Sequence, residues 1–151
     1  MDGMQLAVLE ARKALEEGEI PVGAVLMRGD TVVWADHNRR EQLHDPTAHA
    51  EMLCFSGAAR KLGDWRLRGC TLYVTLEPCP MCAGAMVMSR VEKCVFGVPD
   101  PEKGCCGSVY DFPADPALGA SGTWEQAEDP ESTGECRRLL QACFQSRRLE
   151  K

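Results

Sequence analysis

Residues 71–86 read TLYVTLEPCPMCAGAM, and this stretch joins a strand to a helix. β-Branched and aromatic side chains dominate residues 71–76, as they do in a buried strand. The two prolines that follow break the strand, and small residues and methionines form a helix over residues 81–89. Cys79 and Cys82 fall at the first turn of that helix, where their spacing lets both sulfurs bind a single ion. The stretch therefore predicts a metal-binding turn between a strand and a helix.

A second motif lies upstream, where His49-Ala50-Glu51 stands near the start of another predicted helix. We expect this helix to open at Pro46 and Thr47 and to run to Leu62, where Gly63 ends it. Both motifs thus lie at helix N-termini, whose unpaired N–H groups and positive dipole end favour thiolate over thiol. Two thiolates and one imidazole nitrogen suit a tetrahedral zinc ion and leave its fourth corner open, which is typical of a catalytic site.

Glu51 is the candidate acid–base group. It lies two residues after His49, on another side of the first helical turn, so its carboxylate can miss the metal and still reach the attacking water. A carboxylate in that position can take a proton from water, deliver it to a ring nitrogen and later protonate departing ammonia. The His-x-Glu and Cys-x-x-Cys pair resembles the signature of zinc nucleobase deaminases. This resemblance implies hydrolytic removal of an amino group from a nucleobase, with His49, Cys79 and Cys82 as ligands of one Zn²⁺ ion.

Other interpretations of the Cys-x-x-Cys pair remain open at this point. It could be a redox pair, half of a structural zinc site or a pair of core thiols. The segment lacks a thioredoxin-like βαβ setting, which weakens the redox interpretation. A closed structural site needs a fourth ligand, for which the sequence offers His37, His44, Cys105 and Cys106, none of them in a ligand-type pair.

The remaining segments alternate between helical and strand patterns. We expect helices over 4–15 and 135–149, a hairpin of strands 22–27 and 31–34, a polar loop over 37–45, a strand over 93–98, and a loop-rich segment over 99–134 that contains one strand at 123–126. Strands that alternate with helices predict one α/β domain over residues 1–151, with helices on both faces of one sheet.

Composition limits the class of protein. Apolar residues make up 44% and charged residues 26%, as in ordinary soluble proteins. No apolar run is long enough to span a bilayer, and the N-terminus lacks a signal-peptide layout, so we expect a cytoplasmic protein without membrane contact. Nine cysteines in a reducing compartment favour free thiols or metal ligands. Five of them lie in apolar surroundings and are expected in the core: Cys54, Cys70, Cys94, Cys136 and Cys143.

The net charge of −6 argues against a broad electrostatic surface for nucleic acid. Local basic clusters remain, including Arg39–Arg40 and a C-terminal group formed by Arg147, Arg148 and Lys151. Charge alone therefore leaves nucleic-acid binding open.

The two motifs and the residues around them resemble the cytidine deaminase superfamily, and more specifically the bacterial tRNA-specific adenosine deaminases. The matching runs are Glu19–Val25, His44–Glu51, Thr71–Cys79, Cys82–Met86 and Phe96-Gly97, followed by Asp100, Gly104 and Gly107-Ser108. The resemblance implies a three-layer α/β/α sandwich around a five-stranded mixed sheet. It also implies a homodimer with one zinc ion per subunit, which flips an anticodon-loop adenosine into its site and converts it to inosine at wobble position 34 of tRNA.

The resemblance further assigns RNA contacts. Asn38 matches a residue that hydrogen-bonds the flipped base or its ribose, and Asp100 matches an aspartate near a 2′-hydroxyl. Phe144 and Arg147 match a C-terminal tail that stacks on the RNA loop and clamps it. Each has an ordinary alternative: Asn38 and Asp100 as turn residues, and Phe144 as part of the apolar core face of the last helix.

The chain departs from the family at residues 118–124, where an Asn-His-Arg-type strand is usual and the sequence reads LGASGTW. This departure lies where substrate or a second subunit would be contacted. Two alternatives therefore accompany the tRNA prediction: a guanine, cytosine or nucleoside deaminase acting on a small molecule, and a zinc-stabilised binding module without catalysis.

Overall fold

The computed structural model describes the backbone of residues 1–119 and 122–149 and the side chains of residues 1–119 and 122–146. In chain order the elements are α1 (Gly3–Glu16), β1 (Gly23–Arg28), β2 (Thr31–His37), α2 (Arg40–Leu43), α3 (Ala50–Leu62), β3 (Cys70–Leu76), α4 (Pro80–Met88), β4 (Lys93–Val98), the short 3₁₀ helix η1 (Pro116–Leu118), β5 (Thr123–Gln126) and α5 (Pro130–Leu149).

The strands form one five-stranded mixed sheet in the order β2-β1-β3-β4-β5. β1 pairs antiparallel with β2 and β3, whereas β3, β4 and β5 run parallel. Parallel neighbours need a crossover, and α4 supplies it between β3 and β4. The carboxyl end of β3 therefore leads directly into the turn that carries Cys79.

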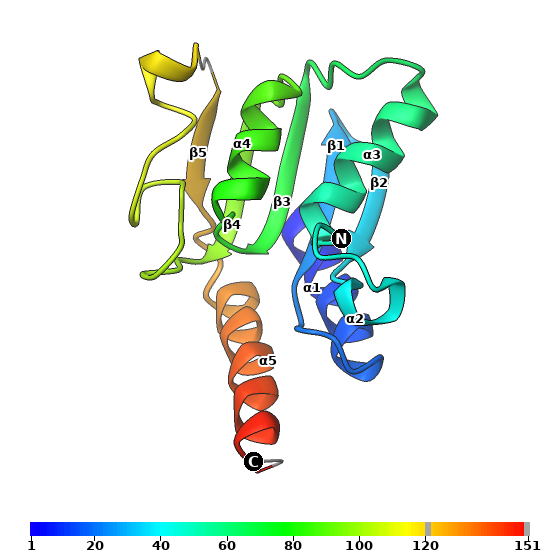
Figure 1. Cartoon of the computed structure of the whole chain (residues 1–151), viewed down its shortest axis with the longest axis vertical. Coiled ribbons are helices and arrows are strands. Elements are labelled where there is room, and N and C mark those ends of the chain that lie inside the picture. Colours follow the sequence, from blue (N-terminus) through cyan, green and yellow to red (C-terminus); the bar gives the residue numbers. More distant parts are fainter. Residues whose placement is uncertain (120–121, 150–151) are drawn as a thin grey trace.

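Helices cover both faces of this sheet, which confirms the predicted three-layer arrangement. In Figure 1, α3 and α4 lie side by side in front of the sheet and α1 lies behind it, while α5 extends beyond the end of β4. α1 contacts α5 on the rear face. Each face has an apolar cluster, one centred on Leu26, Leu72 and Phe55 under α3 and α4, and one on Val25, Val95 and Val8 under α1.

The sequence patterns located most elements correctly. The predicted positions agree to within a few residues for the hairpin, β3, β4, β5 and α4. The helix α1 begins after Asp2, whose carboxylate forms a capping box with Gln5. The five cysteines expected in the core are all buried. None of the helices in the described part of the chain combines the length and apolar character of a membrane span.

Two helix starts and one loop differ from the prediction. α3 begins at Ala50, because Asp45 accepts the backbone N–H of Thr47 and holds the preceding residues in a turn. The expected loop over 37–45 contains α2. α5 begins at Pro130 rather than at residue 135, because the Asp129 carboxylate accepts the backbone N–H groups of Glu131 and Ser132 and so caps an earlier first turn.

Candidate active site

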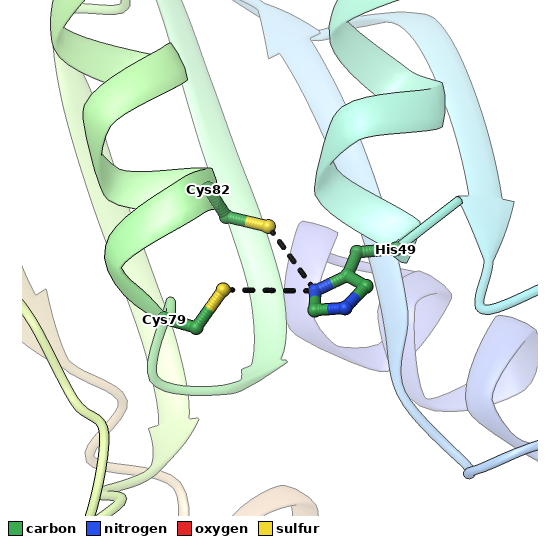
Figure 2. Close-up of side chains that lie close together, drawn as sticks. All are labelled: His49, Cys79 and Cys82. Carbon is green, nitrogen blue, oxygen red and sulfur yellow. Dashed lines mark hydrogen bonds between the residues drawn. The ribbon is translucent and has the colours of Figure 1, made fainter. Parts of the chain in front are cut away.

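Two helix N-termini converge at the carboxyl end of β3. His49 is the N-cap of α3, Cys79 is the N-cap of α4, and Cys82 lies in the first turn of α4. Because α3 and α4 lie next to each other on one face of the sheet, their first residues meet. Figure 2 shows both sulfurs pointing toward the same edge of the His49 ring. The fold thus brings together the three residues predicted as metal ligands.

The spacing of the three side chains fits a zinc ion. The Nδ1 atom of His49 lies 3.6 Å from Sγ of Cys79 and 3.5 Å from Sγ of Cys82. In a tetrahedral site with Zn–S bonds of about 2.3 Å and Zn–N bonds of about 2.0–2.1 Å, nitrogen and sulfur are separated by about 3.6 Å. All three ligand atoms lie within 4.8 Å of one another. Nδ1 is therefore the nitrogen that would bind the ion.

The protonation of these groups favours metal binding. Hydrogen bonds from Cys82 and from His49 lower the pKa of Cys79 to about 4, despite its partial burial. The pKa of Cys82 is raised, chiefly by its hydrogen bond to Cys79 and by burial. The hydrogen bond to Cys79 raises the pKa of His49. Without an ion, the two sulfurs share one negative charge opposite the imidazole, and a divalent cation would allow both to be thiolates.

In the described part of the chain, His49, Cys79 and Cys82 form the only cluster of potential metal ligands, and it contains three of them. Of the candidates for a fourth ligand, His37 is held by Glu10 and Glu17, and His44 is exposed on the loop. Cys105 and Cys106 are buried and do not join the cluster. The fourth corner is therefore open, which is the pattern of a catalytic zinc site.

Glu51 lies in the first turn of α3, beside the cysteine pair. Its side chain is almost completely buried, and burial raises the pKa of its carboxyl to about 7, with a further increase from the charge of Cys79 and a decrease from that of His49. A carboxyl group with a pKa near neutrality can both accept and donate a proton at physiological pH. The position and the protonation of Glu51 suit an acid–base group.

A cavity of about 660 Å³ opens at this cluster, within the size range of small-molecule and nucleoside sites. His49, Glu51 and Cys79 form its floor. Its walls come from the segment after β2, the segment after β4 and one side of α5: Asn38, Arg40, Pro99, Asp100, Pro101, Glu102, Lys103, Arg137, Leu140, Gln141 and Phe144.

The residues expected to contact substrate have different environments. Asn38 is buried at the cavity wall, where its Oδ1 accepts the backbone N–H of Arg40. Asp100 lines the cavity, but its carboxylate accepts the backbone N–H groups of Glu102 and Lys103 and so also closes its own turn.

Phe144 lines the cavity with 49% of its surface exposed, so the alternative that places it in the core is wrong. It lies on the side of α5 that faces the cavity, together with the largely buried Leu140, whereas Leu139 and Cys143 are buried and do not line the cavity. The side chain of Arg147 falls outside the described residues.

Several lining residues were not identified from the sequence. Arg137 and Gln141 precede Phe144, which the resemblance assigns to the RNA loop, at the four- and three-residue spacing of a helix face. This pattern could have predicted that Arg137 and Gln141 share a wall with Phe144. Arg40 and Lys103 add two further cations to the cavity wall. Arg40 opens the four-residue helix α2 and Lys103 lies in a loop, and neither segment is long enough to give a periodic signal, so only the tertiary structure could place them.

The fold and the three converging side chains together define the class of zinc-binding deaminases. The family described as the cytidine and deoxycytidylate deaminase zinc-binding region matches residues 1–98. The chain is 55% identical over 109 residues to the tRNA-specific adenosine deaminase of Bacillus subtilis, which covers 72% of this chain and 68% of that protein. It therefore belongs to the tRNA-specific adenosine deaminase family within the zinc-binding deaminases.

Solved structures agree with this assignment. One from work on A-to-I editing by tRNA:A34 deaminases at the wobble position superposes with a TM-score of 0.85 at 38% identity, covering 91% of this chain and 98% of that one. The guanine deaminase of Bacillus subtilis superposes with a TM-score of 0.64 at 26% identity, covering 93% and 95%. The expected five-stranded mixed sheet of the family is confirmed.

Proposed function

We propose that this protein hydrolyses adenosine to inosine at wobble position 34 of tRNA. The observation that carries the proposal is the open three-ligand cluster of His49, Cys79 and Cys82, which faces a nucleoside-sized cavity beside the buried carboxyl of Glu51. The similarity to tRNA-specific adenosine deaminases supports tRNA as the substrate.

The proposed reaction replaces the 6-amino group of adenine by oxygen from water. A zinc ion held by His49, Cys79 and Cys82 would act as a Lewis acid and would lower the pKa of water. Glu51 takes one proton of the attacking water and transfers it to the ring nitrogen next to the reacting carbon. It then takes the remaining proton from the same oxygen and passes it to the amino group as that group leaves. Water is consumed and ammonia is released, so the reaction needs no redox partner.

The cavity walls supply the proposed substrate contacts. Asn38 offers its amide N–H₂ to the flipped base or its ribose, since its Oδ1 is engaged by Arg40. Phe144 offers an exposed ring on which an unpaired base can stack. Arg147, which comes three residues after Phe144 in the sequence, is proposed to contact the RNA loop, and Asp100 to approach a 2′-hydroxyl.

Inosine formation in an anticodon stem-loop tests the proposal directly. Purified protein with zinc is incubated with a stem-loop carrying adenosine at position 34, and the nucleosides released by digestion are separated by chromatography. We expect inosine at that position and none from a control stem-loop whose only adenosines lie in the stem. Turnover of free guanine, cytosine or cytidine without turnover of the stem-loop would contradict the proposal and favour a small-molecule deaminase.

We also propose a homodimer, in which α4 packs against a second copy of the chain. α4 carries no charged residue, and Met88 at its end is 72% exposed. A Cβ at Gly84 would meet nothing within 4 Å beyond the neighbouring backbone of its own helix, so this side of α4 has room for a partner. An apolar helix face exposed in this way is typical of an interface between subunits.

A tRNA substrate further supports a cytoplasmic location.

A further inference from the structure

Glu77 is a buried carboxylate that the proposed reaction does not use. It stands at the end of β3, two residues before Cys79, and its side chain is 2% exposed. A buried carboxylate is costly unless its oxygens are hydrogen-bonded. The hydrogen-bond donors around the Glu77 carboxylate therefore indicate its role.

All of its partners belong to one loop. Oε1 accepts the backbone N–H of Asp100 at 3.0 Å and the hydroxyl of Ser108. Oε2 accepts the backbone N–H groups of Cys106 at 2.9 Å and of Ser108 at 3.1 Å. The segment from residue 99 to residue 108 thus wraps around a single carboxylate, which takes the place of a partner strand for its backbone donors.

Two further contacts fix the same loop to the same place. The backbone N–H of Cys105 donates to the carbonyl of Pro78 at 2.9 Å, and the backbone N–H of Glu77 donates to the carbonyl of Val98. A Cβ on Gly104 would overlap the Glu77 carboxyl group, so the loop can approach this closely only with glycine there. The loop is therefore bonded to Pro78, the residue before Cys79, and the end of β4 that leads into the loop is bonded to Glu77.

The outer side of this loop is a wall of the cavity. Residues 99–103 line it opposite the segment that carries Asn38, and Cys79 lines its floor. The carboxylate therefore joins the turn that presents the first metal-ligating cysteine to the loop that would contact substrate. Glu77 also borders the cavity, but all four hydrogen bonds to its carboxylate come from the loop, so it acts through these neighbours rather than on the reacting atoms.

We propose that Glu77 is a positioning residue that holds the 99–108 loop in register with Cys79 and so sets the shape of the substrate wall. The structural part of this proposal is independent of substrate, whereas its effect on catalysis rests on the proposed function. Loss of the carboxylate should loosen the wall and leave the zinc ligands in place, since Cys79 and Cys82 are fixed by α4.

The experiment compares Glu77→Gln with the unchanged protein and with Glu92→Gln, which removes an exposed carboxylate just before the start of β4. Gln presents N–H₂ toward backbone N–H donors that need an acceptor. We expect amide hydrogen exchange of Asp100, Cys106 and Ser108 to become faster by about tenfold, the factor that corresponds to one hydrogen bond of ordinary net strength. Exchange in α3 and α4 and the zinc content should not change.

Kinetics on the anticodon stem-loop provide the second measurement. We expect kcat/KM to fall by about 10- to 100-fold, as is usual when a residue that orients a site is lost. The fall should appear mainly in KM, because the wall binds substrate whereas Glu51 and the ligands perform the chemistry. A loss confined to kcat at unchanged KM would overturn the positioning role.

Ser108→Ala is the milder second variant, in case Glu77→Gln does not fold. It removes one donor of the carboxylate from an exposed residue, and Ser56→Ala on α3 is its matched control. Faster exchange confined to the 99–108 loop supports the proposal. Unchanged exchange there in both variants overturns it. Because exchange and zinc content need no substrate, failure of the tRNA activity would be seen separately, in the unchanged protein.

Discussion

The Glu51 side chain is almost completely buried and lies next to the cluster of candidate metal ligands. Its carboxyl adjoins the cavity at the first turn of α3, and burial keeps its pKa close to 7. The Glu51→Gln substitution retains the shape of the side chain and removes its ability to transfer protons. We expect zinc content to be unchanged and kcat to fall by about 10² or more. The two measurements are elemental analysis and inosine formation.

Glu16→Gln, an exposed change at the end of α1, is the control and should retain full turnover. Retained turnover in Glu51→Gln would show that another group moves the protons. The same variant separates the enzyme from a zinc-stabilised binding module. A module that only binds would lose nothing on this substitution.

At the scale of elements, the contact between α1 and β1 depends on one glycine. A Cβ at Gly23 would overlap the carbonyl of Ala7 and the backbone nitrogen of Ala11. We expect Gly23→Ala to lower the free energy of unfolding by about 1–3 kcal/mol, the usual effect of overpacking. Urea denaturation followed by circular dichroism measures the change.

Gly134→Ala is the matched substitution with the opposite expected sign. Gly134 lies inside α5, and its added Cβ would meet only the flexible end of Arg138. Alanine inside a helix is more stable than glycine by about 0.5–1 kcal/mol. Equal effects of the two substitutions would contradict the packing of α1 on β1 described above.

α2 depends on a carboxylate from outside its own segment. Glu19, which is buried before β1, accepts the backbone N–H groups of Glu41 and Gln42 in α2. Although burial raises the pKa of Glu19, the hydrogen bonds from Gln42 and Glu41 prevail and lower it below its ordinary value of 4.5. α2 therefore gains stability from the ionised carboxylate.

This contribution has a defined pH dependence. Because the pKa of Glu19 is lower in the folded state than in the unfolded state, the stabilisation is complete above pH 4.5 and is lost as the pH falls through the folded pKa. We expect the amide NMR signals of Glu41 and Gln42 to titrate with a midpoint below 4.5, and this titration to disappear in Glu19→Gln. A midpoint above the ordinary value would show that burial outweighs the hydrogen bonds.

At the scale of the whole molecule, one sheet carries the five strands of the described residues, and we propose that residues 1–151 form a single domain around it. The proposed dimer uses the outer side of α4, at whose end Arg90 stacks on the exposed ring of Trp65. We expect Met88→Asp to place a charge in that interface and to shift the mass in analytical ultracentrifugation from twice 16.6 kDa to 16.6 kDa. Val32→Asp, at the opposite edge of the sheet, should leave the mass unchanged.

The metal cluster is the part of the site that local sequence specifies best. Cys79 and Cys82 are brought to one side by a single helical turn, and His49 is placed by the start of another helix, so residue type and spacing were sufficient to predict all three. The helix that they open was also placed correctly, because Pro78 and Pro80 end the strand by removing its backbone donors.

The start of α5 was misplaced for a different reason. Asp129-Pro130 is a local capping signal, and the loop-rich composition around it concealed the first turn. α2 could not have been predicted from its own residues, since the acceptor for its N-terminal N–H groups is Glu19, far away in the sequence.

By itself, the sequence predicted the three candidate metal ligands that the structure brings together, the order of strands and helices, and the buried cysteines, and it is the basis for proposing Glu51 as the acid–base residue. Each of these follows from short-range chemistry: periodicity, proline and glycine positions, and ligand spacing. Only the tertiary structure determined which loops form the cavity, that Phe144 faces it, and that Glu77 binds the wall to the turn before Cys79. These depend on contacts between distant segments, whose partners are chosen by burial and hydrogen-bond satisfaction in the folded chain rather than by neighbouring residues.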